Sequence, residues 1–179
     1  MQTIKEKYQH TAIPAMEKRF GYKNKMAIPK IVKVVVNVGT GSVNDKKKIE
    51  DIEKGLIQIT GQKPSPRSAK KSIATFKLRE GTTIGYAVTL RGKKMNDFLE
   101  KLINVTIPRM RDFKGLNINS VDEMGNFSMG IREYLIFPEV SHEDLSRNFG
   151  LSLTVVTSAK TKEEAMELLK LLGFPFSKK

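Results

Sequence analysis

The sequence predicts an α+β fold, in which a predominantly antiparallel sheet carries helices on one face and leaves the other face open. Three observations support this fold class. Some segments alternate apolar and polar side chains as strands do, others have the apolar stripe of an amphipathic helix, and the two kinds of segment do not alternate regularly along the chain. The clearest strand lies within Lys30–Gly41, where the valines at even positions from Val32 to Val38 share one face. The opposite face carries Lys33 and Asn37, which suits contact with a polar partner. An ordinary exposed strand face is the alternative that this segment alone leaves open.

A second strand, Thr82–Arg91, divides its side chains in the same way. Its even-numbered positions from Ile84 to Leu90 are large and mostly apolar, whereas its odd-numbered positions carry small residues, hydroxyls and a cation. Two strands with the same division strengthen the prediction of an open polar face. Further strands are expected over Asn117–Val121, Asn126–Ile131 and Leu151–Thr157, with a turn at Asp122–Gly125 between the first two.

Helices are predicted from apolar stripes at helical spacing and from residues that cap helix ends. Thr3 and Glu6 have capping-box spacing at the start of the first helix, in which Pro14 would introduce a kink. Thr161 and Glu164 repeat that spacing near the end of the chain. The predicted helices cover Thr3–Phe20, Asp45–Thr60, Lys93–Thr106, a short segment that Ser141 and Asp144 would cap, and a last one that Thr161 opens and Gly173 closes.

Length and composition narrow the functional classes. The 179 residues suggest a single domain spanning residues 1–179, without a linker or an internal repeat. Lysines and arginines outnumber acidic residues by 32 − 19 = 13, which favours a polyanionic partner, above all nucleic acid. No apolar run is long enough to span a membrane, and the first residues do not have the pattern of a signal peptide, so no membrane partner is expected.

One segment concentrates positive charge. Two prolines, Pro64 and Pro66, restrict its beginning to extended or edge structure. The segment from Gly61 to Arg79 is basic, and we expect a long projecting loop or hairpin at about 69–82. Phe76 lies within it and either stacks on a base or packs into the foot of the loop. The segment contains no acidic residue from Gly61 to Arg79, and its cations are Lys63, Arg67, Lys70, Lys71, Lys77 and Arg79.

The motifs of common enzymes are missing, so we expect a binding or structural protein and not an enzyme. The glycine turn from Gly39 to Asn44 lacks the third glycine of a dinucleotide fingerprint and the lysine of a Walker loop. The chain has no cysteine, and its two histidines, His10 and His142, have no metal-ligand spacing, so no metal and no cofactor are expected. A phosphate-handling enzyme that uses the glycine turn, and a general nucleic-acid chaperone, are the two rival hypotheses.

A series of short motifs occurs in order along nearly the whole chain. They are Asn37-x-Gly39-x-Gly41, Gly61-Gln-Lys-Pro64, Ala69-Lys-Lys-Ser-Ile-Ala-x-Phe-Lys-Leu-Arg79, Val88-Thr-Leu-Arg-Gly92, Pro108-Arg-x-Arg-Asp-Phe-Lys-Gly115, Gly125-Asn126 and Ile136-Phe-Pro-Glu139. With these motifs the chain closely resembles the family of bacterial large-subunit ribosomal protein five, which binds 5S rRNA. It departs from the family pattern at Glu123, Phe127 and Tyr134, where glycine, tyrosine and glutamine are usual.

The resemblance implies a structural constituent of the large ribosomal subunit in the cytoplasm, although an organellar ribosome is not excluded. Such proteins anchor 5S rRNA in the central protuberance beside another 5S-binding ribosomal protein and contact large-subunit rRNA. Their open sheet face is the rRNA surface, which would here comprise Lys33, Asn37, Gly39, Gly41, Gln62, Lys63, Thr89 and Arg91.

The resemblance also assigns partners to two loops. The basic loop of the family approaches peptidyl-site tRNA, and its residues here are Lys70, Lys71, Ser72, Phe76, Lys77 and Arg79. A bridge to small-subunit ribosomal protein thirteen would use Arg109, Arg111 and Lys114, although Asp112 could instead pair with either arginine.

Overall fold

The computed structural model describes residues 3–41, 43, 45–76, 78–111, 113–140 and 149–177. Its strands are β1 (Ile31–Gly39), β2 (Ser65–Ser68), β3 (Thr83–Leu90), β4 (Phe127–Ile131) and β5 (Leu151–Thr157). Its α-helices are α1 (Ile4–Lys7), α2 (Ile13–Phe20), α3 (Lys46–Thr60), α4 (Gly92–Lys101) and α5 (Lys162–Leu172). Two π-helical turns, Tyr8–Ala12 and Leu102–Thr106, continue α1 and α4, and short 3-10 turns cover Lys25–Ala27, Ala74–Phe76, Ile107–Arg109, Ile118–Ser120 and Tyr134–Ile136.

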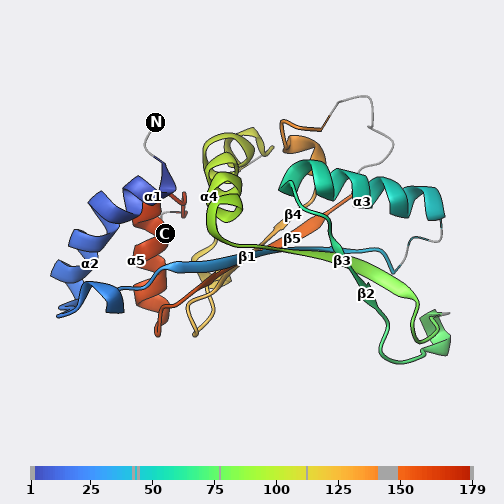
Figure 1. Ribbon diagram of the computed structural model, residues 1–179, viewed down its shortest axis with the longest axis horizontal. Coiled ribbons are helices and arrows are strands. Elements are labelled where there is room, and N and C mark those ends of the chain that lie inside the picture. The colour runs from blue at the N-terminus through green and yellow to red at the C-terminus, as the bar shows by residue number, and fades with distance from the viewer. Residues whose placement is uncertain are drawn as a thin grey trace. The chain divides into compact units, whose positions relative to one another are not determined.

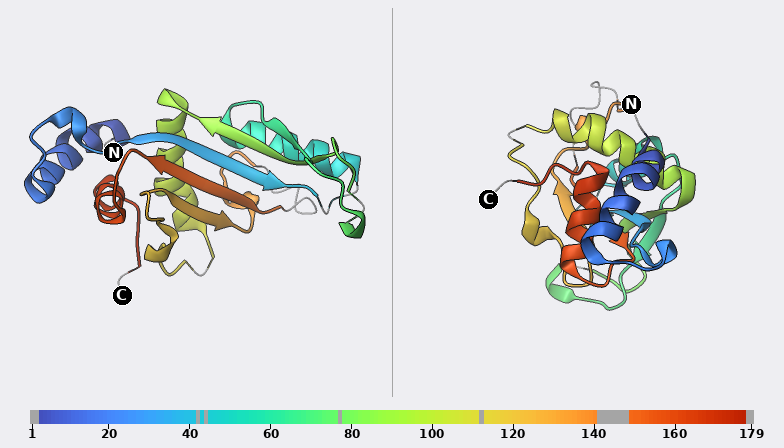
Figure 2. Two further views of the ribbon diagram at one scale, coloured as in Figure 1. Left: turned by 90° about the horizontal axis from the view of Figure 1, so that it is seen from below. Right: turned by 90° about the vertical axis from the view of Figure 1, so that its left-hand side faces the viewer.

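The strands form one sheet in the order β2-β3-β1-β5-β4, and neighbouring strands run in opposite directions (Figures 1 and 2). The pairing of β2 with β3 is antiparallel, with Ser65 opposite Ala87. In antiparallel pairs the end of one strand lies beside the start of its neighbour. Two backbone hydrogen bonds show this arrangement: Ser158 N, after β5, donates to Lys30 O, before β1, and Thr40 N, after β1, donates to Ile84 O in β3. The predicted α+β class with an antiparallel sheet is confirmed.

The chain divides into two compact units whose segments alternate along the sequence. Unit 1 combines Met1–Val34, Leu90–Met129 and Thr154–Lys179, and unit 2 combines Val35–Thr89 and Gly130–Leu153. Four of the strands, β1, β3, β4 and β5, contribute residues to both units. Whether residues 1–179 act as a single domain stays a prediction.

In unit 2, α3 covers the core face of the sheet (Figure 1). Asp45 caps this helix by accepting a bond from Lys47 N, and Gly61 ends it in the left-handed conformation. Burial, followed by the carboxylates of Glu53 and Glu50 on α3, raises the pKa of Tyr86 on β3. The helix layer predicted for one face of the sheet is therefore present in this unit.

In unit 1, α1 and α2 each pack against α5, and Ala12, Met16 and Leu168 are fully buried. The predicted capping box joins Thr3 and Glu6, each of which accepts a bond from the backbone N–H of the other. The expected effect of Pro14 takes the form of a π-helical turn, in which Ile13 N donates to Tyr8 O. A second π-helical turn precedes Pro108, because a wider turn accommodates a ring that cannot donate a hydrogen bond.

Three sequence expectations are wrong in part. Asn117–Val121 is not a strand: Asn117 caps a 3-10 turn, and only Val121 forms an isolated bridge with Phe127. Val32 is 37% exposed, because alternation sets the direction of a side chain but not whether another element covers it. Gly85 and Ala87 are buried although they belong to the predicted open face.

The burial of Gly85 has an internal cause. A Cβ at this position would lie 2.7 Å from the carbonyl oxygen of Val38, closer than real contacts allow. The small size of this residue is therefore required by the approach of the neighbouring strand and not by an external partner.

Candidate nucleic-acid interface

Strand β1 carries the centre of the predicted interface. Val34, Val36 and Val38 are buried in the core, whereas Asn37 on the opposite face is exposed, as the alternation predicts. The backbone carbonyl of Asn37 accepts a bond of 3.3 Å from Ser152 Oγ on β5, so the two residues are neighbours on the open face of unit 2. An exposed amide on a flat strand can donate and accept bonds with sugar and phosphate groups.

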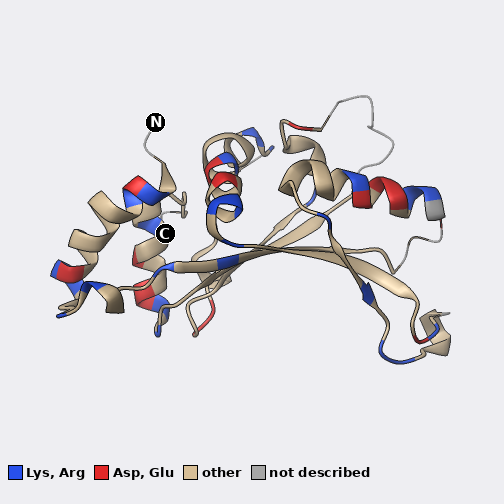
Figure 3. Cartoon of the chain, in the orientation of Figure 1, with Lys and Arg blue, Asp and Glu red and all other residues tan. Residues whose placement is uncertain are grey.

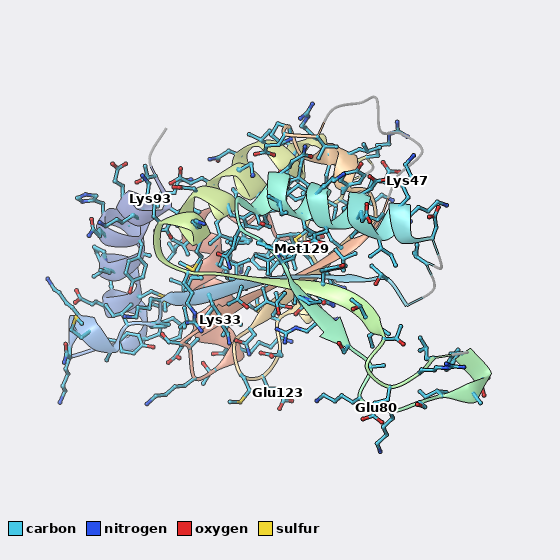
Figure 4. The ribbon with its side chains drawn as sticks, turned by 45° about the vertical axis from the view of Figure 1, so that its right-hand side comes forward. Lys33, Lys47, Glu80, Lys93, Glu123 and Met129 are labelled. Atoms are coloured by element: carbon cyan, nitrogen blue, oxygen red, sulfur yellow. The ribbon has the colours of Figure 1, made fainter. Side chains whose placement is uncertain are left out.

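Lys33 lies on the same strand, in the part that belongs to unit 1. Figure 4 labels Lys93, which belongs to α4, on one side of β1. It shows the side chain of Lys33 on the other side of the strand. Lys33 is half-buried. The predicted polar face of β1 is thus present in each unit.

Strand β3 and the segment before β2 bring three further predicted residues together in unit 2. Gln62 Nε2 donates to the backbone carbonyl of Thr89 across 3.3 Å, which ties the end of α3 to β3. Gln62 and Thr89 are half-buried, and Lys63 is exposed. Arg91, in unit 1, is exposed at the N-cap position of α4. Gln62, Lys63 and Thr89 thus carry polar groups in one unit.

Gly39 and Gly41 follow at the end of β1. A Cβ at Gly39 would meet nothing within 4 Å, and at Gly41 it would only touch Ile84 at 3.9 Å. Neither residue has a positive φ angle. The fold itself therefore does not require glycine at either position, which fits the prediction that a partner backbone approaches here.

The basic loop is a hairpin that continues β2 and β3. Reciprocal backbone bonds of 3.0 and 3.1 Å join Ile73 and Leu78, and Ser72 Oγ accepts a bond from Glu80 N. Lys70, Lys71 and Arg79 are exposed, whereas Lys77 lies outside the described residues. Figure 3 shows the hairpin extending beyond the sheet, with basic positions in blue on β2 and along the loop. Figure 4 labels Glu80 on the same hairpin.

The position of Phe76 decides between the two interpretations of its ring. The 3-10 turn Ala74–Phe76 forms the tip of the hairpin, and Phe76 is 69% exposed there. Ile73 on the same tip is also exposed. Packing of the ring into the foot of the loop is therefore wrong, and the ring is available to a planar or apolar group of a partner.

The three bridge candidates are exposed in unit 1. Arg109 ends the 3-10 turn Ile107–Arg109, and Arg111 and Lys114 follow it. The alternative pairing with Asp112 falls outside the described residues. The segment is fixed downstream, where Leu116 N donates to Pro175 O and Ser177 N donates to Leu116 O.

The polar side chains of β4 and β5 lie outside the predicted interface. Ser128 and Thr154 have their hydroxyl oxygens 3.1 Å apart in unit 1, and Ser152 lies beside Asn37 in unit 2. The alternation of β5 was visible in the sequence, but its place beside β1 was not. Arg67, exposed on the edge strand β2, adds a cation to unit 2.

Comparison with known proteins decides the family. A model described as ribosomal protein L5 matches residues 24–79, and a second model, which describes the C-terminus of this ribosomal protein family, matches residues 83–176. The chain belongs to the ribosomal protein L5 family. Bacterial relatives named large ribosomal subunit protein uL5 include those of Carboxydothermus hydrogenoformans (49% identity), Dictyoglomus thermophilum (52%) and Ruminiclostridium cellulolyticum (51%). Each match covers 99% of this chain and at least 99% of the relative.

Membership of the L5 family confirms several predictions. This L5 chain is a structural constituent of the large ribosomal subunit, its partner is rRNA, and its location is the cytoplasmic ribosome. The family is not enzymatic, so the rival hypothesis of a phosphate-handling enzyme is wrong. No helix among the described residues is long and apolar enough to cross a membrane.

Proposed function

We propose that this L5-family chain binds 5S rRNA through the open face of its sheet and thereby anchors that RNA in the central protuberance. The observation that carries the proposal is the exposed, polar side of β1, where Asn37 lies opposite the buried valines. Gln62 and Thr89 add polar groups in the same unit, and the excess of 13 positive charges supplies attraction to phosphates. Shape and sugar contacts would select one RNA fold.

The proposal predicts a preference for 5S rRNA over a size-matched unrelated RNA. Binding of both RNAs is measured across a salt series, because contacts to phosphates weaken as salt rises whereas shape-specific contacts persist. We expect a large preference for 5S rRNA that survives moderate salt. Equal affinities that fall together with salt would contradict the proposal and would favour a general nucleic-acid chaperone.

We further propose that the basic hairpin at 69–82 faces peptidyl-site tRNA. Its exposed cations and the exposed ring of Phe76 support this role. The prediction is that the Lys70→Ala and Lys71→Ala double variant leaves the affinity for 5S rRNA within about 0.5 kcal/mol of wild type, as expected for residues outside that surface. The same variant should disturb tRNA placement in reconstituted ribosomes.

Chemical footprinting of tRNA in ribosomes that carry the hairpin variant provides the measurement. Lys47→Ala with Lys48→Ala, on the exposed side of α3 in the same unit, removes the same charge elsewhere and serves as the control. A loss of 5S rRNA affinity in the hairpin variant, beyond that of the control, would show that the hairpin belongs to the 5S rRNA surface.

We also propose two protein partners, a small-subunit ribosomal protein and a neighbouring 5S-binding ribosomal protein. Arg109, Arg111 and Lys114 would contact small-subunit ribosomal protein thirteen, because they are exposed cations on a segment fixed by backbone bonds near Leu116. The neighbouring 5S-binding ribosomal protein is expected to contact the same RNA. Crosslinking from a photoreactive residue at position 111 in whole ribosomes tests the first contact.

A further inference from the structure

A second glycine of the sheet, besides Gly39, has no role that the protein itself explains. Gly130 lies within β4, is exposed, and has no positive φ angle. A Cβ at this position would meet nothing within 4 Å. Glycine in a strand is unfavourable, because it has more conformational freedom to lose on folding and no side chain to pack. Folding alone would therefore favour a larger residue here.

Gly85 provides the contrast within the same unit. Its missing side chain is explained inside the protein, because a Cβ there would strike the carbonyl oxygen of Val38. Both residues belong to unit 2 and lie within strands. The fold therefore needs glycine at position 85, but it does not need glycine at position 130.

The pairing of β4 with β5 places Gly130 in line with the predicted interface. The hydroxyl oxygens of Ser128 on β4 and Thr154 on β5 lie 3.1 Å apart, so these two residues face each other across the strand pair. In an antiparallel pair, moving two residues along each strand brings Ser152 opposite Gly130. Ser152 in turn contacts Asn37 on β1. Asn37, Ser152 and Gly130 therefore form a row across three neighbouring strands.

We propose that Gly130 is a specificity-determining residue of the RNA surface, where the sugar–phosphate backbone of 5S rRNA approaches β4 so closely that a Cβ would block it. This inference rests on the proposed function, and it extends the RNA surface from β1 across β5 to β4. Ser152 supplies a hydroxyl beside the approaching backbone, and its oxygen can accept a bond from a ribose 2′-OH. The exposed amide of Asn37 continues the same polar row.

The test measures RNA affinity and thermal stability for the same set of variants. Gly130→Ala and Gly130→Val are expected to retain or raise Tm, because a side chain suits a strand. Gly130→Ala should weaken binding of 5S rRNA by about tenfold, and Gly130→Val should weaken it further. Gly85→Ala is the matched control and should lower Tm, because its Cβ meets the backbone of Val38.

The outcomes separate this inference from the proposed function. If wild type prefers 5S rRNA but Gly130→Val binds it equally well, the assignment of Gly130 is overturned while the proposed function stands. If wild type itself shows no preference for 5S rRNA, the proposed function fails. A Tm of Gly130→Ala well below that of wild type would also overturn the inference, because the glycine would then serve the fold.

Discussion

Replacing Phe127 with alanine is expected to lower the free energy of unfolding by about 3–5 kcal/mol, the usual cost of truncating a fully buried aromatic ring. Phe127 begins β4 and is completely buried. Its ring contacts those of Phe174 and Phe176 edge to face, with centroids 5.8 and 5.7 Å apart. Its loss would therefore also loosen the C-terminal segment. Denaturant unfolding followed by circular dichroism measures the change.

Ser128→Ala is the matched control for that experiment, because it alters the next residue of the same strand on the exposed side. Its effect should stay within about 0.5 kcal/mol, as for most surface substitutions. A Phe127→Ala variant as stable as this control would show that the aromatic cluster does not hold the C-terminal segment to unit 1.

Asn37→Ala is expected to weaken 5S rRNA binding by about 1–3 kcal/mol, which is roughly 5- to 150-fold in Kd. Asn37 is exposed in the free protein, so its removal should leave the fold intact. In the complex, however, a sugar or phosphate group that had bonded to the amide would be buried without a partner. Filter binding or calorimetry at fixed salt measures the difference.

Asn119→Ala controls for the loss of an exposed asparagine outside the proposed surface. Its Kd for 5S rRNA should equal that of wild type. If Asn37→Ala also binds normally and its unfolding curve is unchanged, Asn37 does not contact the RNA, and the surface must be assigned to other residues.

The sequence by itself determined the local structure of this protein. Helix starts were predictable at Thr3 and Thr161, because capping depends on side chains within three residues of the backbone groups that they satisfy. The faces of β1 and β5 were predictable because successive side chains of a strand point in opposite directions. The ordered motifs also determined the family, which the two matching family models confirm.

Tertiary structure decided which of these faces meet. The order β2-β3-β1-β5-β4 puts Ser152 beside Asn37, 115 residues apart in sequence, and neither strand's alternation contains that information. It also showed that Gly85 is small because β1 approaches it, whereas Gly130 has open space around it. Periodicity is a property of neighbouring residues, but strand pairing and burial depend on contacts between distant ones, so only the folded chain reveals them.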